Sequence, residues 1–186
     1  FTDHIDKIRK SLPSIKHFIC VGETTKNDID YEQLISSTSY KNLPEQVQSE
    51  DLAWLFYTSG TTGKPKGAML SHRNLIAMAN SYLSDVNPVK QKDVLLHAAP
   101  ITHGSGLIIF HHIVRAASHT FPSNSSFIPN EIFKNIQDNK VTTMFLAPTM
   151  INMLVSSKEI SKYDVSSLHT VIYGGGPMYT EHILKA

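Results

Sequence analysis

Short apolar runs alternate with amphipathic stretches along this 186-residue chain. Strands are predicted where a run is short, apolar and rich in β-branched or aromatic residues. Such runs occupy residues 17–21, 53–58, 93–98, 119–121, 142–146 and 170–173. Between them, apolar residues recur at helical spacing, which predicts three buried helical stripes. The stripes are Leu75, Ile76, Ala79, Tyr82 and Leu83; Ile132, Phe133 and Ile136; and Ile151, Leu154 and Val155. This alternation predicts an α/β fold in which helices flank a mostly parallel sheet.

A polar stretch separates the start of the chain from its main body. Residues 36–50 show no periodicity and contain Pro44, which is typical of a linker. We therefore expect an N-terminal βα segment and polar linker over residues 1–49, followed by an α/β body over residues 50–186. The longest apolar stretch, residues 106–117, is interrupted by His111, His112 and Arg115. It falls short of the ~20 apolar residues of a membrane helix, so no transmembrane segment is expected.

Charge and cysteine content narrow the classes of partner. The chain has 17 Lys and Arg against 16 Asp and Glu, a formal net charge of +1, and no long basic run. This balance argues against nucleic acid as a partner. The single cysteine, Cys20, cannot form an intrachain disulfide, which is typical of a reducing compartment. We therefore expect a cytoplasmic protein.

The segment with the clearest chemistry is residues 57–67, which read YTSGTTGKPKG. Gly60, Gly63 and Gly67 allow positive φ and leave space for backbone N–H groups to surround an anion. Hydroxyl donors stand between these glycines, and two ammonium groups follow them. These side chains are Thr58, Ser59, Thr61, Thr62, Lys64 and Lys66. The composition predicts a phosphate-binding loop, and the alternative is a Ser/Thr/Gly hairpin that binds no ligand.

This loop differs from the Walker A loop of nucleotide triphosphatases. Walker A requires four residues between Gly and Gly-Lys, whereas only two separate Gly60 from Gly63. Pro65 follows Lys64 and prevents the loop from continuing directly as a helix. The predicted loop therefore lacks the helix N-terminus on which phosphate rests in those enzymes.

The loop and the following AMLSHRNL, residues 68–75, resemble the signature of the adenylate-forming superfamily, which includes acyl-CoA synthetases, peptide-synthetase adenylation domains and luciferases. Residues 99–107, APITHGSGL, resemble the Pro-x-x-His element that borders the carboxylate substrate in this family. Residues 173–178, YGGGPM, resemble its Gly-Gly-Ala-Pro loop beside the adenine and acyl pockets. The three segments occur in the family's order, and the resemblance covers the chain from about residue 49 to its end.

The resemblance implies that a carboxylate attacks the α-phosphate of ATP, and that a thiol then takes the acyl group from the adenylate. It implies a phosphate site at Thr58, Ser59, Gly60, Thr61, Thr62, Gly63 and Lys66, where Mg²⁺ shares the phosphate charge. It implies an adenine and acyl pocket at His103, Gly104, Ser105, Gly174, Gly175, Gly176 and Pro177. Lys66, at the family's Pro-Lys-Gly position, and His103 are the implied catalytic residues. His97, His103, His111 and His112 lack metal-site spacing, so we expect no protein-held metal.

The substrate is predicted from what surrounds His103. Ser105 and Gly106 are small, which suggests space for an acyl tunnel, and residues 104–114 contain no carboxylate that could meet an α-amino group. The resemblance then favours a fatty acid as substrate and CoA as the thiol, although Ser123 stands where related CoA ligases often have a basic residue. The alternatives are adenylation of an aryl or amino acid, or a non-catalytic nucleotide-binding fragment.

The family's later elements do not occur in these 186 residues. They are an aromatic-Gly-x-Thr-Glu motif, a ribose-binding Asp, a hinge and the catalytic Lys of a C-terminal domain. The resemblance therefore implies part of the layered N-terminal domain of an adenylate-forming enzyme, with its own C-terminal domain missing from this chain. We expect the chain alone to bind ATP or pyrophosphate weakly and to turn nothing over.

Overall fold

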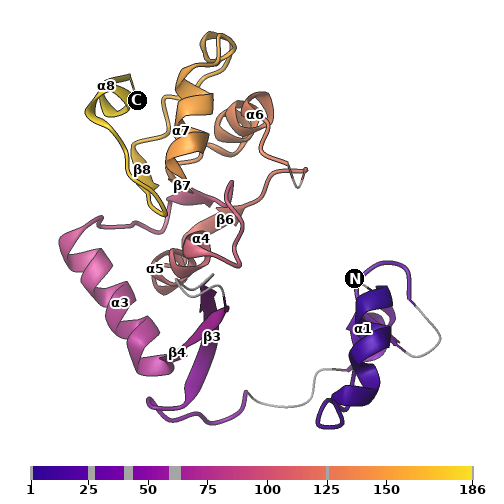
Figure 1. Cartoon of the computed structure of the whole chain (residues 1–186). Coiled ribbons are helices and arrows are strands. Elements are labelled where there is room, and N and C mark those ends of the chain that lie inside the picture. The colour runs from indigo at the N-terminus through magenta and orange to yellow at the C-terminus, as the bar shows by residue number, and fades with distance from the viewer. Residues whose placement is uncertain (1, 25–27, 40–43, 59–63, 125, 186) are drawn as a thin grey trace. The chain divides into compact units, whose positions relative to one another are not determined.

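The computed structural model describes residues 2–24, 28–39, 44–58, 64–124 and 126–185. The chain forms two compact units, residues 1–46 and 47–186, and each is considered by itself (Figure 1). In the first unit, a short parallel pair of strands stands between helices. Its elements are α1 (Thr2–Ile8), η1 (Arg9–Ser11), β1 (Ile19–Cys20), β2 (Ile29–Asp30) and α2 (Tyr31–Ser37). The Asp30 carboxylate caps α2 by accepting the backbone N–H of Gln33 at 2.7 Å.

The second unit begins with an antiparallel hairpin of β3 (Leu52–Thr58) and β4 (Lys66–Ser71). Strand β4 leads directly into α3 (His72–Asp85), and a capping box of Ser71 and Asn74 satisfies the first N–H groups of that helix. Strand β3 was expected, but β4 was not. Its residues KGAMLS lack the apolar and β-branched content of a buried strand, and it forms because β3 supplies its hydrogen bonds.

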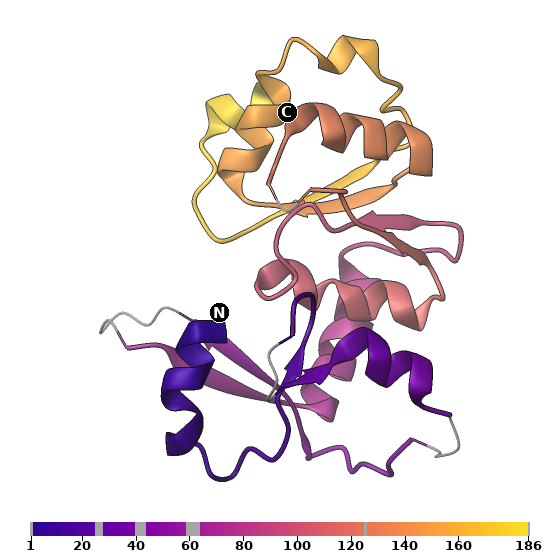
Figure 2. The same cartoon turned by 90° about the vertical axis from the view of Figure 1, so that its right-hand side faces the viewer.

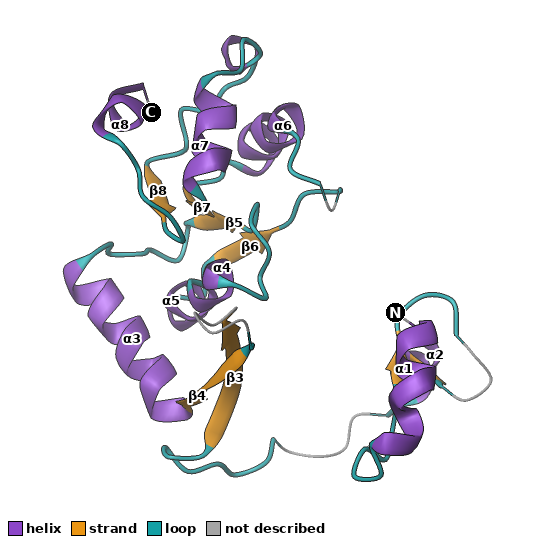
Figure 3. Ribbon diagram, viewed as in Figure 1, coloured by secondary structure: helices purple, strands orange, loops and turns teal. Residues whose placement is uncertain are grey.

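Among the described residues, four strands form a parallel sheet in the order β6-β5-β7-β8 (Figure 3). Helices lie between and after these strands. The strands are β5 (Val94–Leu96), β6 (Ser118–Thr120), β7 (Thr143–Leu146) and β8 (Thr170–Tyr173). The helices are α4 (Gly104–Leu107), α5 (Ile109–Val114), α6 (Pro129–Asn139), α7 (Pro148–Val155), η2 (Ile160–Lys162) and α8 (Thr180–Lys185). The predicted α/β class and the mostly parallel sheet are confirmed.

Helices cover the two faces of this sheet (Figure 2). On one face, α6 and α7 pack with Leu96, Met144 and Leu146 into an apolar cluster. On the other face, α4 contacts β7, α5 contacts β6, and α3 packs on α5. The sheet therefore separates an apolar layer from the layer to which the hairpin is joined through α3.

The predicted helical stripes are mostly buried. Leu75, Ala79 and Tyr82 are buried on α3, as are all three predicted positions of α6 and two of the three on α7. The other two predicted positions on α3 are Leu83, which is partly buried, and Ile76, which is 59% exposed. In the described part of the chain, no helix is both long and apolar enough to cross a bilayer.

Candidate functional site

The predicted phosphate loop lies at the closed end of the β3–β4 hairpin. Thr58 and Lys66 are direct cross-strand partners at that end, and both are exposed. Residues 59–63, which include the predicted phosphate ligands Ser59, Gly60, Thr61, Thr62 and Gly63, lie outside the described residues. Lys64 is exposed, and the chain after Pro65 continues as a strand, so the loop does not run into a helix. The two residues at the ends of the loop, Thr58 and Lys66, therefore lie side by side on adjacent strands.

Aromatic contacts attach the hairpin to the layer beside the sheet. The Trp54 ring packs edge-on against Phe110 of α5, with ring centroids 6.1 Å apart, and against Phe56 at 5.6 Å. Tyr57 lies across β4, where a Cβ on Gly67 would stand only 3.1 Å from its ring. Gly67 is therefore needed for close approach of a ring within the hairpin, in addition to its place in the loop motif.

The second predicted segment leaves the carboxyl end of β5. It runs from residue 97 to His103, the residue that precedes α4 as its N-cap. The His103 side chain is exposed and forms no capping hydrogen bond with the helix. In open α/β sheets, ligands bind outside the carboxyl ends of the strands, and His103 occupies that edge.

The third predicted segment leaves the carboxyl end of β8, and the ring of Phe145 connects it to the second. A Cβ on Gly104 would lie 3.1 Å from Phe145 Cζ, and a Cβ on Gly174 would lie at the same distance. Gly175 has a φ of +81°, which favours glycine, and Gly176 and Pro177 are exposed beyond it. The structure therefore brings together the His103 and Gly174 segments around one aromatic side chain.

Phe145 was missed by the sequence analysis, which treated β7 as a uniform apolar run. A strand alternates its faces, so Phe145 must point away from the side that buries Met144 and Leu146. That alternation was the available signal. It places Phe145 on the same side as α4.

One expectation about the acyl site is wrong. Ser105 and Gly106 were expected to leave space for an acyl tunnel, but a Cβ on Gly106 would lie 2.0 Å from the Ile101 carbonyl oxygen and 2.8 Å from Trp54. The missing side chain of Gly106 allows close packing and opens no space. Ser105 is only 2% exposed.

Histidines cluster on the same layer as His103. His111 and His112 are buried in α5, and the Ile108 carbonyl oxygen accepts a hydrogen bond from each ring, at 3.2 and 3.3 Å from Nδ1. Burial, followed by the nearby His119 and His112, lowers the pKa of His97 to about 4. Burial also lowers the pKa of His112 to about 4. Within the described ranges, no group of three or more His, Cys, Asp or Glu side chains has the geometry of a metal site.

The ends of the predicted phosphate loop, the His103 segment and the Gly174 segment follow one another in the order that is typical of adenylate-forming enzymes. The chain belongs to the AMP-binding enzyme family, whose model matches residues 2–186. It is 33% identical over 152 residues to peroxisomal OPC-8:0-CoA ligase 1 of Arabidopsis thaliana. The aligned region covers 81% of this chain and 28% of that protein. The resemblance to adenylate-forming enzymes is therefore confirmed.

Solved structures share the fold. The anthranilate CoA ligase AuaEII in complex with anthranoyl-AMP superposes with a TM-score of 0.85 at 23% identity, covering 100% of this chain and 36% of that one. ATP-bound MatB from Rhodopseudomonas palustris superposes with a TM-score of 0.70 at 28% identity, covering 83% and 30%. The chain thus spans about a third or less of the length of these proteins.

Proposed function

We propose that this chain supplies the phosphate loop and one wall of the carboxylate site in an enzyme that activates a carboxylate with ATP and transfers the acyl group to CoA. The observation that carries the proposal is the convergence of Gly104 and Gly174 on the Phe145 ring. It joins the two segments implied to border the substrate into one continuous surface, at the sheet edge where α/β proteins bind ligands.

The donor set of the hairpin end fits a polyphosphate. Its polar groups are hydroxyls, backbone N–H groups and the ammonium of Lys66, all of which donate to phosphate oxygens. Lys66 is exposed at this end of the hairpin, where its ammonium can reach a ligand. An ammonium about 4 Å from a phosphate oxygen gains about 4 kcal/mol at an effective dielectric of 20, before desolvation is subtracted. Mg²⁺ requires oxygen ligands, which the phosphates of ATP supply, and it would share the charge of the departing pyrophosphate.

In the proposed mechanism, the chain positions groups and forms no covalent bond. Thr58, residues 59–63 and Lys66 hold the β- and γ-phosphates, while Gly174 to Pro177 border the adenine and the acyl group. His103 has an imidazole that helix capping does not use, and it meets the carboxylate or the acyl phosphate. The remaining catalytic groups are proposed to lie in the two thirds of the relatives' length that this chain does not cover.

A fatty acid is the first candidate substrate, because no carboxylate in residues 104–114 meets an amino group. A compact aryl acid is the second candidate, and Phe145 favours it. A flat ring held between two glycines limits the depth of the surface beside His103 and offers an aromatic face for stacking. CoA is the proposed thiol and the cytosol the proposed compartment. The relative named above carries "peroxisomal" in its own name.

The two lysines of the hairpin test the phosphate assignment in the full-length product of the gene that encodes this chain. Lys66→Ala should slow carboxylate-dependent pyrophosphate exchange by about 10²-fold, the size expected when one electrostatic contact to the transition state is removed. Lys64→Ala is the matched control, since Lys64 is equally exposed but lies outside the family's Pro-Lys-Gly position. Equal rates for the two variants would refute the assignment.

Phe145 tests the choice of substrate. Phe145→Ala should raise kcat/KM for octanoate relative to benzoate, because removing the ring deepens the surface and removes the stacking partner. An unchanged ratio would show that Phe145 does not border the acyl group.

The 186-residue chain alone should give no hydroxamate from ATP, Mg²⁺, either acid and hydroxylamine. Product formation would contradict the proposal that some catalytic groups lie outside this chain.

A further inference from the structure

Among the described residues, histidines from three elements meet beside the sheet. His97 follows β5, His119 lies in β6, and His112 belongs to α5. The Nε2 of His97 and the Nδ1 of His119 are 2.9 Å apart, and the two rings are nearly parallel. His112 meets His119 edge-on, with ring centroids 6.0 Å apart. His97 is 4% exposed and His112 is fully buried.

The hydrogen bond between His97 and His119 requires at least one neutral ring. One imidazole must donate its N–H while the other offers a lone pair, and a doubly protonated pair has no acceptor. The second nitrogen of each ring, Nδ1 of His97 and Nε2 of His119, is buried and has no partner among the described residues. A proton added there would bring charge into an interior that offers it no hydrogen bond.

The groups that face this pair do not compensate a positive charge. From α5 come His111 and His112, which would themselves gain protons, and α3 contributes the phenol of Tyr82, stacked on His111 at 4.0 Å. The acidic group that acts on the cluster is Asp93. Its carboxylate already accepts the backbone N–H of Lys90 at 2.8 Å. Burial accordingly lowers the pKa of His97 and of His112 to about 4, and it also lowers the pKa values of His111 and His119.

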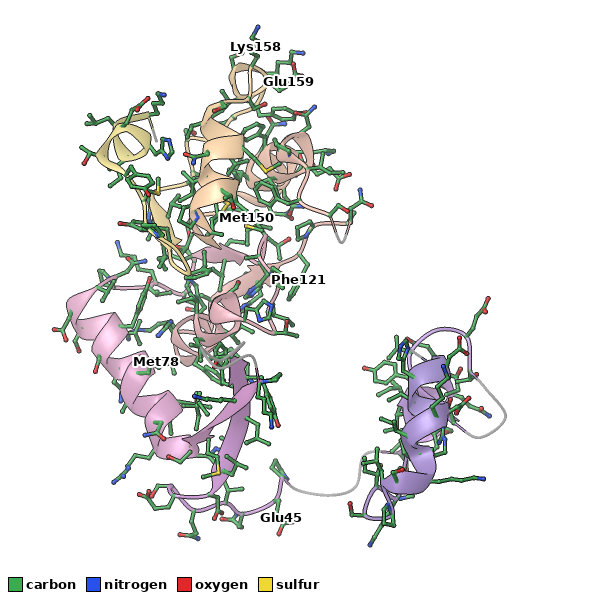
Figure 4. All side chains as sticks on the ribbon, viewed as in Figure 1. Glu45, Met78, Phe121, Met150, Lys158 and Glu159 are labelled. Atoms are coloured by element: carbon green, nitrogen blue, oxygen red, sulfur yellow. The ribbon has the colours of Figure 1, made fainter. Side chains whose placement is uncertain are left out.

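His97 is also the first residue of the segment that carries His103. The backbone N–H of His97 donates to the Thr120 carbonyl at 3.0 Å. Phe121, which follows β6 and is labelled in Figure 4, stacks on the His97 ring with centroids 4.8 Å apart. The segment then closes with a hydrogen bond from the His103 N–H to the Pro100 carbonyl at 3.1 Å. A hollow of about 260 Å³ lies along it. Its lining residues include His97, Pro100, Ile101, Phe121 and Asn124.

We propose that the neutral His97–His119 pair positions the segment carrying His103, and that acidification releases this segment from the sheet before the rest of the unit unfolds. His97 and His119 are positioning residues, since they act through the backbone of residues 97–103. The consequence for catalysis rests on the proposed function, because it requires that His103 meets the substrate. The release itself depends only on the contacts described above.

The expected size follows from proton linkage. Once released into water, a histidine regains an ordinary pKa near 6.5 and takes up a proton. Each released histidine then shifts the ratio of open to closed segment about tenfold for each pH unit below ~6.5. Two histidines that are released together shift this ratio about 100-fold for each pH unit.

Hydrogen exchange of the chain measures this release without any assay of activity. Protection factors of the His103 and Gly106 amides, which donate to the Pro100 and His103 carbonyls of the segment, should fall at least tenfold between pH 6.5 and 5.5. That of the Val141 amide, bonded to Ile136 in the apolar layer, should change much less. Equal losses at all three amides would show global unfolding and overturn the proposal.

Substitutions separate titration from packing. His119→Gln retains a donor and an acceptor but cannot titrate, so the loss of protection should become about tenfold shallower for each pH unit. His17→Gln is the control, because His17 is exposed and lies in the first unit, outside the cluster, and it should retain the wild-type slope. A wild-type slope in His119→Gln would also overturn the proposal.

Activity of the full-length gene product completes the test. The ratio of kcat/KM at pH 8 to that at pH 6 should be smaller in His119→Gln than in the wild type, whereas a purely structural role would lower both values equally. If the exchange results hold and no carboxylate is activated, the proposed function fails and the positioning role stands. If activation occurs and the segment stays protected in acid, the positioning role fails alone.

Discussion

The two faces of the parallel sheet carry different types of residue. Toward α6 and α7, the sheet buries Leu96, Met144 and Leu146 in a cluster of apolar residues. Toward α4 and α5, it carries Phe145, a group of buried histidines and glycines packed against rings and carbonyls. The predicted substrate segments meet on this second face.

The contrast shows how one sheet combines stability with a site. The apolar face gains its stability from area removed from water, which does not depend on pH. The second face depends on neutral histidines and on glycines that leave no space for a side chain. Protonation of a histidine or addition of a methyl group to a glycine therefore disturbs it. A substitution or a proton on one face, set against a control, therefore tests this contrast.

The largest effect is expected from a cavity in the apolar face. Phe133 is 1% exposed at the centre of the cluster, so Phe133→Ala should destabilise the unit by about 3 to 5 kcal/mol. Urea unfolding should give the same loss at pH 7 and pH 5.5, because no titrating group is removed. The exposed neighbour Lys134→Ala should change stability by less than about 1 kcal/mol. A strongly pH-dependent loss for Phe133→Ala would break the contrast between the faces.

On the second face, one added methyl group should approach that effect. Gly106→Ala places a Cβ 2.0 Å from the Ile101 carbonyl oxygen, which forces the backbone or Trp54 to move. The expected cost is about 2 to 3 kcal/mol. Gly176→Ala is the control, because its Cβ would stand at an ordinary 3.7 Å from Pro148 and should cost less than about 0.5 kcal/mol. Similar unfolding midpoints for the two variants would mean that Gly106 is not tightly packed.

A smaller change in the free energy of unfolding is expected for each pH unit of acidification. The pKa values of His97 and His112 are lowered to about 4 in the folded chain, below the ordinary value of 6.5, so the unfolded chain binds more protons between these limits. Their contribution to stability is therefore complete above pH 6.5 and is lost as the pH falls toward 4. The limiting slope is about 1.4 kcal/mol per pH unit for each histidine.

Urea unfolding at pH 7, 6 and 5 measures this slope. His112→Gln should flatten it by up to the contribution of one histidine, while His17→Gln, on an exposed ring of the first unit, should leave it unchanged. An unchanged slope in His112→Gln would show that this buried ring does not carry the pH dependence.

The sequence predicted the apolar face better than the site face. Burial of Ile132, Phe133 and Ile136 follows from helical spacing, which reports one-sided packing directly. Strand β4 could not be found in this way, since Lys66 to Ser71 pair with β3 through the backbone and leave little apolar pattern. Ile76 fits the α3 stripe, yet the neighbouring elements cover only part of that helix.

For the site, motifs identified segments but not their contacts. Lys66, His103 and Gly174 were named from local strings, and their roles remain predictions. Phe145, which joins two of the segments, belongs to none of the strings, and its role depends on residues 41 and 29 positions away in the sequence. Gly106 was misinterpreted for the same reason, because a missing side chain is consistent with both open space and close packing until its neighbours are known.

The smallest effect is expected where the two layers are built alike. Ala116, after α5, and Lys140, after α6, both have left-handed φ values, +52° and +51°, and each lies just before a parallel strand. An L residue in this region costs about 1 to 2 kcal/mol, and glycine avoids that cost but loses about 0.5 to 1 kcal/mol of chain entropy. Ala116→Gly should therefore stabilise the unit by about 0.5 kcal/mol. Lys140→Gly should gain less, because it also removes the exposed ion pair between Lys140 and Asp164, 3.0 Å apart. Thermal unfolding of the two variants against the wild type measures the difference, and a destabilised Ala116→Gly variant would show that the Ala116 methyl group forms contacts worth more than the strain that it imposes.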